Sequence, residues 1–173
     1  MPQGRLIALD GVDGTTLGSA ARDMAAEHRT EKPCVSVWDA SGIFSEVALA
    51  TVGAGDPSAR TLLLLYAADL AYRVRAEIEP ALKAGRLVIA APYIGTAVAY
   101  ADAVGLDPLW VQRMLAFAPA ADRTLSVDGG AHDRADDRKG FVELCCQQIP
   151  QWRPEAARAA LVARAAARLR AQA

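Results

Sequence analysis

The feature that most constrains the fold is a short apolar run that ends in a glycine-rich turn near the N-terminus. The run Arg5–Leu9 (RLIAL) is followed at 10–14 by Asp-Gly-Val-Asp-Gly, and Leu87–Ala91 (LVIAA) is a second apolar run of the same length. Such runs are typical of strands buried on both faces, which occur in parallel sheets covered by helices on both sides. The sequence therefore predicts an α/β domain.

Strands and helices are expected to alternate along the rest of this region. The patterns predict further strands at 34–38 and 123–127, and helices at 19–28, 58–82 and 108–117, the second of them bent or ended near Pro80. The expected fold is a three-layer domain with a parallel sheet of about 4–5 strands flanked by helices. A chain of 173 residues fits one hydrophobic core, so we expect 1–173 to be a single domain.

The alternation weakens after Asp128. Residues 129–140 are polar and contain glycine, which predicts a loop, and a helix is expected at 141–148. Residues 155–170 are rich in Ala and Arg and predict a basic C-terminal helix with one solvated face.

Charge and cysteine content exclude several classes of protein. The chain has 19 Lys and Arg against 20 Asp and Glu, whereas a general nucleic-acid binder needs a basic surface. No apolar run approaches the ~18 residues of a membrane helix. The three cysteines, two of them adjacent at 145 and 146, give neither a disulfide framework nor a metal site. We therefore expect a cytoplasmic protein with no metal site, no membrane contact and no nucleic-acid partner.

The glycine turn is the first candidate functional element. A glycine-rich turn between a strand and a helix presents backbone N–H groups to an anion. The phosphate-loop pattern G-x-x-x-x-G-K-[ST] requires Lys and a hydroxyl residue, but Leu17 and Gly18 stand at those positions. The sequence thus predicts a remnant of a phosphate loop, made of Gly11, Asp13, Gly14, Thr15, Thr16 and Ser19.

Together with its surroundings, this turn resembles the opening of thymidylate kinases, in which a strand leads into E-G-x-D-G-x-G-K-[ST]. Three further stretches match in the same order. Residues 63–70 (LLLYAADL) resemble the family's L-F-A-A-D-R helix, 78–85 (IEPALKAG) resemble its helix end, and 88–100 (VIAAPYIGTAVAY) resemble the D-R-Y segment and the run after it. The resemblance covers residues 4–128.

The resemblance implies a P-loop kinase fold, a dTMP-like nucleotide ligand and a homodimer. It places Tyr66, Tyr93 and Tyr100 beside the nucleoside, although tyrosines on these elements are also ordinary packing residues. Arg134 and Arg138 resemble a remnant of the family's arginine-bearing lid, with a solvated loop as the alternative. The lid at 129–140 and the C-terminus are expected to be truncated.

The departures from the family pattern fall on charged positions. Leu17 replaces the loop Lys and Gly18 the hydroxyl that binds Mg²⁺. Leu70 replaces the Arg of L-F-A-A-D-R, and Ala91 and Pro92 replace the Asp and Arg of D-R-Y. Phosphoryl transfer depends on cations that neutralise the moving group. The sequence therefore predicts a pseudokinase with no confident catalytic residue, which acts by nucleotide binding or as an assembly subunit.

Two alternatives stay open. One is a divergent but active dTMP kinase that uses ATP and Mg²⁺ and recruits Arg22, Arg134 or Arg138 in place of the lost groups. The other is a ligand-free structural dimer subunit, with Leu17 and Leu70 packed into the former phosphate space. Its partner would be a second copy, docked through the helix at 58–82, or another protein.

Overall fold

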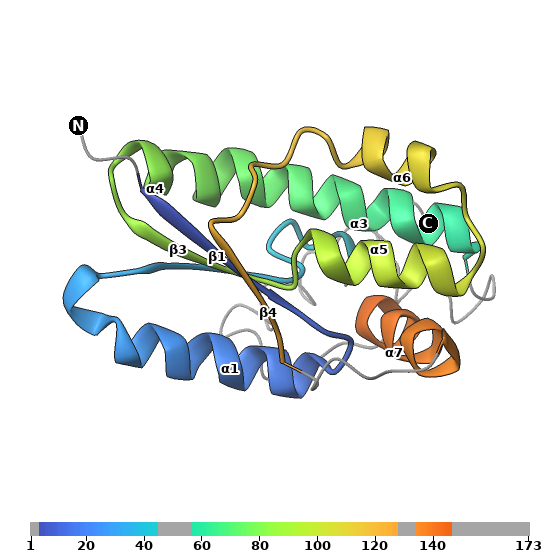
Figure 1. Cartoon of the computed structure of the whole chain (residues 1–173), viewed down its shortest axis with the longest axis horizontal. Helices are drawn as coiled ribbons and strands as arrows, with labels where there is room; N and C mark the ends of the chain where they lie inside the picture. The colour runs from blue at the N-terminus through green and yellow to red at the C-terminus, as the bar shows by residue number, and fades with distance from the viewer. Residues whose placement is uncertain (1–3, 45–56, 128–133, 147–173) are drawn as a thin grey trace, which may run out of the picture.

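The computed structural model describes residues 4–44, 57–127 and 134–146. Four parallel strands form one sheet in the order β2-β3-β1-β4. They are β1 (Arg5–Asp10), β2 (Cys34–Val37), β3 (Leu87–Ala91) and β4 (Arg123–Ser126). The predicted α/β class with a parallel sheet is confirmed (Figure 1).

The two apolar runs are the central strands. Leu6 pairs with Val88 and Ala8 with Ala90 in a parallel register between β1 and β3. All five residues of β3 are buried, as are the last five of β1. This burial explains why both strands are continuously apolar, because each has helices on both of its faces.

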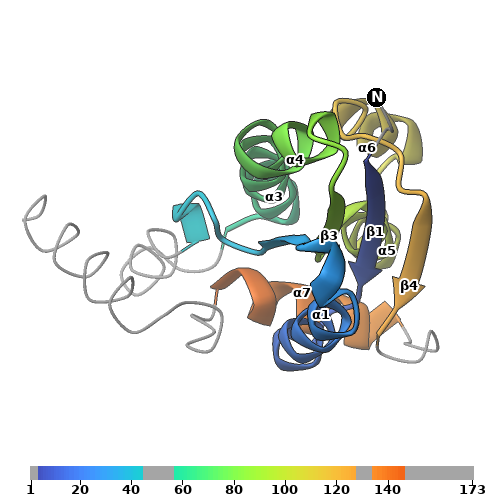
Figure 2. The same ribbon diagram turned by 90° about the vertical axis from the view of Figure 1, so that its left-hand side faces the viewer.

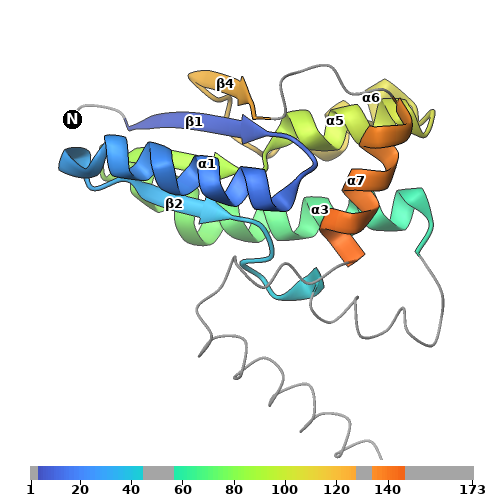
Figure 3. The same ribbon diagram turned by 90° about the horizontal axis from the view of Figure 1, so that it is seen from below.

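Helices cover both sides of the sheet. Figures 1 and 2 show α1 (Gly14–Glu27) on one side, and α3 (Ala59–Arg73) and α5 (Ile94–Ala103) on the other. The remaining helical elements are η1 (Arg29–Glu31), η2 (Val74–Ile78), α4 (Glu79–Lys83), α6 (Pro108–Met114) and α7 (Arg134–Cys146). Figure 3 shows α7 crossing near α3 and α5, and α7 contacts both.

Polar residues fix where several helices begin. The Ser58 side chain accepts a hydrogen bond from the Thr61 N–H at the start of α3, and Asp107 accepts one from Leu109 at the start of α6. Pro108 is the first residue of α6, where its missing N–H is not needed.

The long helix does not stop at Pro80. α3 continues through η2, a π-helical segment, into α4, which ends at Lys83. Pro80 stands in the first turn of α4, where an α-helix tolerates proline.

Three other features of the helices differ from the sequence expectation. The first helix begins at Gly14 rather than at residue 19, because Asp13 caps it. A helix that was not expected, α5, follows β3. The region expected as a loop at 129–140 is helical from Arg134, and Asp136 and Asp137 in its first turn favour a helix N-terminus. The expected helix at 155–170 lies outside the described residues.

Candidate functional site

The glycine turn lies between the carboxyl end of β1 and the start of α1. The Asp13 carboxylate accepts hydrogen bonds from the N–H groups of Thr15, at 2.8 Å, and Thr16, at 3.2 Å. Partial burial by itself would raise the pKa of Asp13, but the hydrogen bonds from Thr16 and Thr15 together outweigh it and lower that pKa. An ionised carboxylate therefore occupies the N-terminus of α1, the place where such turns attract anions.

The residues that follow the turn face the core. Leu17 is 0% exposed and belongs to the hydrophobic core cluster, and Gly18 is also buried. Arg22, one turn further along α1, is exposed and donates a hydrogen bond to the Ser19 hydroxyl at 3.1 Å. The structure thus gives Leu17 a packing contact with the core and leaves Arg22 on the outer surface of α1.

Asp10, at the end of β1, holds the start of α5. Its carboxylate accepts hydrogen bonds from the Tyr93 N–H at 2.9 Å, the Thr96 N–H at 2.9 Å and the Thr96 hydroxyl at 2.8 Å. It also accepts one from the Gly95 N–H, and a Cβ at Gly95 would lie 2.5 Å from the same carboxylate. Asp10 therefore caps α5 from a distant part of the chain, which is why the α5 sequence carries no capping residue of its own.

A buried ion pair links α3 to the ends of β2 and β3. Arg73 and Asp69 are both 0% exposed, and their Nε–Oδ2 distance is 3.1 Å. The guanidinium also donates to the Pro92 carbonyl at 2.9 Å and to the Ser36 carbonyl at 3.5 Å. The other Asp69 oxygen accepts from the N–H and hydroxyl of Ser41. This pair is not among the residues expected from the sequence, although its i, i+4 spacing is a usable signal.

The three candidate nucleoside-pocket tyrosines are brought together, but they are buried. Tyr66, Tyr93 and Tyr100 are at most 2% exposed. The Tyr66 hydroxyl donates to the Tyr93 carbonyl at 2.5 Å, and the Tyr93 hydroxyl donates to the Pro119 carbonyl at 2.7 Å. Burial raises the pKa of Tyr66 and raises that of Tyr93 to about 12. All three tyrosines are therefore packed in the interior, and the hydroxyl groups of Tyr66 and Tyr93 are hydrogen-bonded there.

Phe141, on α7, fills the space between two of them. Its ring stacks on Tyr100 with 4.0 Å between ring centroids and an interplanar angle of 12°, and it lies 5.3 Å from Tyr66. Tyr66 in turn stacks on Trp38 at 4.6 Å. The sequence predicts only a helix at Phe141, because nothing in the pattern of one helix shows which distant rings it will contact.

The other positions that depart from the family pattern are also in the interior. Leu70 and Ala91 are both 0% exposed, and Pro92 is buried. The Ala91–Pro92 peptide bond is cis.

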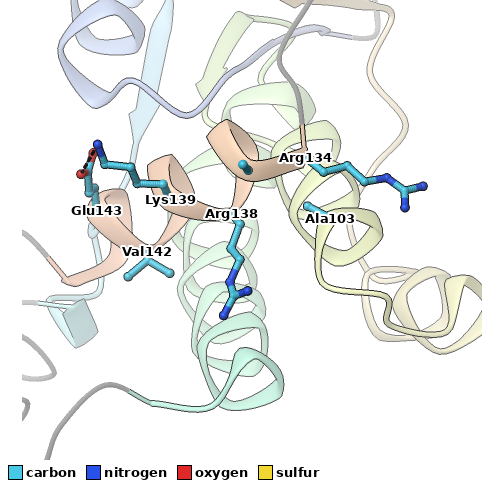
Figure 4. Close-up of a pocket in the computed structure, with 7 residues that line it drawn as sticks. Ala103, Arg134, Arg138, Lys139, Val142 and Glu143 are labelled. Atoms are coloured by element: carbon cyan, nitrogen blue, oxygen red, sulfur yellow. Dashed lines mark ion pairs between the residues drawn. The ribbon is translucent and has the colours of Figure 1, made fainter.

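The candidate lid arginines lie on α7. Arg134 pairs with Asp102, at the end of α5, with 3.3 Å between Nη2 and Oδ2 and with both side chains exposed. Arg134 and Arg138 line a shallow hollow of about 480 Å³ together with Ala103, Ala135, Lys139, Val142 and Glu143. Figure 4 shows Arg138 and Val142 directed to the same side of α7, with Lys139 and Glu143 joined as an ion pair.

The opposite edge of α7 approaches the glycine turn. A Cβ at Gly140 would lie 2.6 Å from two side-chain atoms of Val12. The turn and the lid arginines are therefore on different sides of α7, and the structure does not bring Arg134 and Arg138 to the phosphate-loop remnant.

No group of three or more His, Cys, Asp and Glu residues that could hold a metal ion occurs among the described residues. No helix in the described ranges is both long enough and apolar enough to span a membrane.

The arrangement defines a class of protein: a parallel α/β domain with a glycine turn between its first strand and first helix, as in P-loop kinases. A sequence model described as thymidylate kinase matches residues 10–135. The chain belongs to the thymidylate kinase family.

Individual relatives agree with this assignment. A probable thymidylate kinase of Pyrobaculum aerophilum is 29% identical over 126 residues, covering 70% of this chain and 63% of the relative. A thymidylate kinase of Xanthomonas campestris pv. campestris is 34% identical over 132 residues, covering 73% of this chain and 57% of the relative. The chain thus spans less than two thirds of the length of either relative.

A solved structure confirms the fold. The crystal structure of thymidylate kinase from Ehrlichia chaffeensis superposes with a TM-score of 0.61 and covers 83% of this chain and 87% of that one. The two sequences are 18% identical, so this similarity concerns the fold alone.

Proposed function

We propose that this chain is a thymidylate-kinase-like protein that no longer transfers a phosphoryl group and acts by nucleotide binding or as an assembly subunit. The observation that carries the proposal is Leu17, which stands at the position of the loop Lys and is wholly buried. A buried apolar side chain cannot neutralise phosphate charge, and a phosphate beside it is poorly compensated.

The expected loss of rate is large. Removing one electrostatic stabiliser of a transition state often lowers the rate by about 10²-fold or more. Gly18, Leu70, Ala91 and Pro92 add further changes at family positions, and Leu70 and Ala91 are, like Leu17, core residues. Apolar side chains carry no charge that could replace the missing cations. Their burial also holds them in the core, because moving them would expose apolar surface to water.

The carboxylates near the turn do not fit a Mg²⁺ site. Asp10 directs both oxygens to N–H groups at the start of α5, and Asp13 accepts hydrogen bonds from the α1 backbone. Gly18 has no hydroxyl to offer. The residues at this turn therefore do not support a reaction step through a metal ion.

An active dTMP kinase, which converts dTMP and ATP to dTDP and ADP, is the second candidate. Kinship favours it over a loss of activity, because the relatives described above carry the name thymidylate kinase. It requires ATP and Mg²⁺ as the family does. It also requires Arg22, Arg134 or Arg138 to leave their present positions and reach the glycine turn.

A ligand-free structural subunit is the third candidate. The burial of both Leu17 and Leu70 supports it, since the two side chains that replace charged groups of the family are packed in the hydrophobic core. This candidate includes a homodimer or another protein partner. We place the protein in the cytoplasm under all three candidates.

The deciding experiment is a coupled assay of ADP release with dTMP and MgATP, with the Xanthomonas thymidylate kinase measured in parallel. We expect a rate for this chain at least about 10²-fold below the control, as the loss of one stabiliser already predicts. Robust dTDP formation that disappears in an Asp13→Ala variant would exclude the proposal and establish the kinase.

Thermal unfolding with ATP, ADP, dTMP and dTDP, each with and without Mg²⁺, separates the remaining candidates. A ligand that binds only the native state raises the melting temperature. A shift with dTMP alone supports a nucleotide binder, whereas a shift with MgATP supports the kinase. No shift with any of the four supports the structural subunit.

A further inference from the structure

A group of basic side chains lies at the amino end of the sheet, opposite the end that carries the glycine turn. Arg5 opens β1, Arg29 and Lys32 lie in the turn between α1 and β2, and Arg86 precedes β3. All four residues are exposed. We call Arg5, Arg29, Lys32 and Arg86 the basic cluster. Figure 3 shows the turn between α1 and β2 beside the start of β1, at the end of the sheet away from α7.

Hydrogen bonds hold the segments of the basic cluster together. The Arg5 N–H donates to the Arg86 carbonyl at 3.2 Å. The Arg86 guanidinium donates twice to the Lys32 carbonyl, from Nη2 at 2.8 Å and from Nε at 3.2 Å. The Lys32 N–H donates to the Arg29 carbonyl at 3.2 Å. Three segments that are distant in the sequence are therefore joined into one surface.

Lys32 has a backbone conformation that favours glycine. Its φ of 47° and ψ of 61° are in the left-handed region, and it caps the end of η1. A residue with a Cβ is disfavoured there, because the Cβ comes too close to the backbone. The two hydrogen bonds from Arg86 hold this conformation. An exposed lysine where glycine would fit better indicates that the ammonium group has a use.

The positive charges of the basic cluster are only partly compensated. The Glu31 carboxylate accepts a hydrogen bond from Arg5 at 2.6 Å and lies 2.9 Å from Nδ1 of His28. Within the described ranges, no acidic side chain forms an ion pair with Arg29 or Lys32. The whole chain has a net charge of -1, so this surface departs from the average of the molecule. Carboxylates of a partner would complement the charges of Arg29 and Lys32.

We propose that the basic cluster is a docking surface for an acidic segment of a partner protein, with Arg29 and Lys32 as its contacts. A peptide can place its carboxylates opposite these cations and away from Glu27 and Glu31, which are their neighbours in the sequence. A nucleic acid carries a phosphate on every nucleotide and must bring some of them near these carboxylates. The inference is independent of phosphoryl transfer, because the basic cluster and the glycine turn lie at opposite ends of the sheet.

The probe is a fluorescent ten-residue peptide of alternating Glu and Ser, and the same peptide with Gln in place of Glu is the control ligand. Fluorescence anisotropy with the full chain measures the affinity. We expect only the Glu peptide to bind, and binding should weaken between about 50 and about 500 mM salt, since salt screens exposed charges. An Arg29→Gln, Lys32→Gln variant should bind the Glu peptide about fivefold more weakly, because each exposed ion pair contributes modestly.

Two further variants make the result specific. Arg113→Gln with Lys139→Gln removes two exposed cations from α6 and α7 and should bind the Glu peptide as the unchanged chain does. Lys32→Gly removes the ammonium group but suits the left-handed conformation. We expect Lys32→Gly to have a melting temperature no lower than that of the unchanged chain and still to bind the Glu peptide more weakly. A purely structural role of Lys32 would not give this combination.

Several results would overturn the proposal. If the Glu peptide did not bind, or if the Arg113→Gln, Lys139→Gln variant lost as much affinity as the Arg29→Gln, Lys32→Gln variant, the basic cluster would not be a specific docking surface. Tighter binding of a ten-nucleotide oligodeoxyadenylate than of the Glu peptide would assign the surface to a nucleic acid instead. A lower melting temperature of Lys32→Gly would show that the Lys32 side chain stabilises the fold, which would remove the reason for a partner contact there.

Discussion

Asp10 and Asp13 both bind the N-terminus of a helix with a carboxylate. Asp10 caps α5 and Asp13 caps α1, and both lie at the carboxyl edge of the sheet, within four residues of each other. In open parallel sheets this edge is where ligands bind. In this chain two of the helix N-termini at that edge already have a negative charge supplied by the protein.

The lowered pKa of Asp13 predicts a pH-dependent contribution to stability. A carboxyl group whose pKa is lower in the folded state stabilises that state above its ordinary value of 3.8, and the contribution is lost as the pH falls through the folded value. Asp13→Asn removes the charge, so the difference in unfolding free energy between the two proteins should be constant well above pH 3.8 and should shrink as the pH falls through and below that value. Urea unfolding of both proteins at several pH values measures this difference in unfolding free energy.

A matched variant makes the same Asp-to-Asn change at another helix cap. Asp107→Asn changes the capping residue of α6, a group that lies far from the glycine turn in sequence. If the difference in unfolding free energy between the unchanged chain and Asp13→Asn stayed constant over the whole pH range, the charge of Asp13 would not contribute to capping α1.

At the scale of elements, α3 is fixed to the sheet by a buried network. Arg73 reaches the carbonyl groups of Ser36 and Pro92, at the ends of β2 and β3, while Asp69 holds Ser41. The Arg73 guanidinium also lies 6.0 Å above the Trp38 ring. The network therefore positions α3 and Trp38.

This network predicts that changes at Asp69 and Arg73 have strongly non-additive effects on the free energy of unfolding. Arg73→Met leaves Asp69 as an uncompensated buried charge, which should destabilise the protein by about 3–5 kcal/mol. A double variant, Asp69→Leu with Arg73→Met, should lose less than the sum of the two single changes, because no charge is left unpaired. Denaturant unfolding of all four proteins gives the coupling free energy.

The exposed pair Lys83–Glu79 provides the control. Lys83→Ala should change stability by at most about 1 kcal/mol, since both side chains are exposed. Additive effects of the Asp69 and Arg73 changes would show that the two residues are not coupled.

For the molecule as a whole, we expect the proposed homodimer to form through α3. Leu64 and Tyr72 are 52% and 49% exposed, and eight residues of helix place them on the same face. We expect sedimentation equilibrium to give twice the 18.3 kDa of one chain. A Leu64→Glu, Tyr72→Glu variant should sediment as a monomer, because two charges in an apolar interface are not compensated.

Val98→Glu is the control for this experiment. Val98 is 48% exposed but lies on α5, so its substitution should leave the dimer intact. If the unchanged chain were a monomer, there would be no homodimer to explain. If the double variant still dimerised, the dimer interface would not be on α3.

The sequence was sufficient for the order and type of most elements. The runs at 5–9 and 87–91 predicted the two central strands, because continuous burial on both faces requires continuous apolarity. It was not sufficient for α5 or for the first part of α7. α5 is capped by Asp10, which is 83 residues before Tyr93 in the chain, and no local pattern records such a contact.

The same division holds for the candidate site. The sequence by itself determined which charged groups are absent, because Leu17, Gly18, Leu70, Ala91 and Pro92 are chemical identities that need no coordinates. It also singled out the three tyrosines. Only the tertiary structure decided that these leucines face the core, that Arg134 and Arg138 lie away from the glycine turn, and that Phe141 fills the space between Tyr66 and Tyr100. The physical reason is that residue identity fixes which charges a chain can offer, whereas burial and ring contacts depend on segments that meet only when the chain has folded.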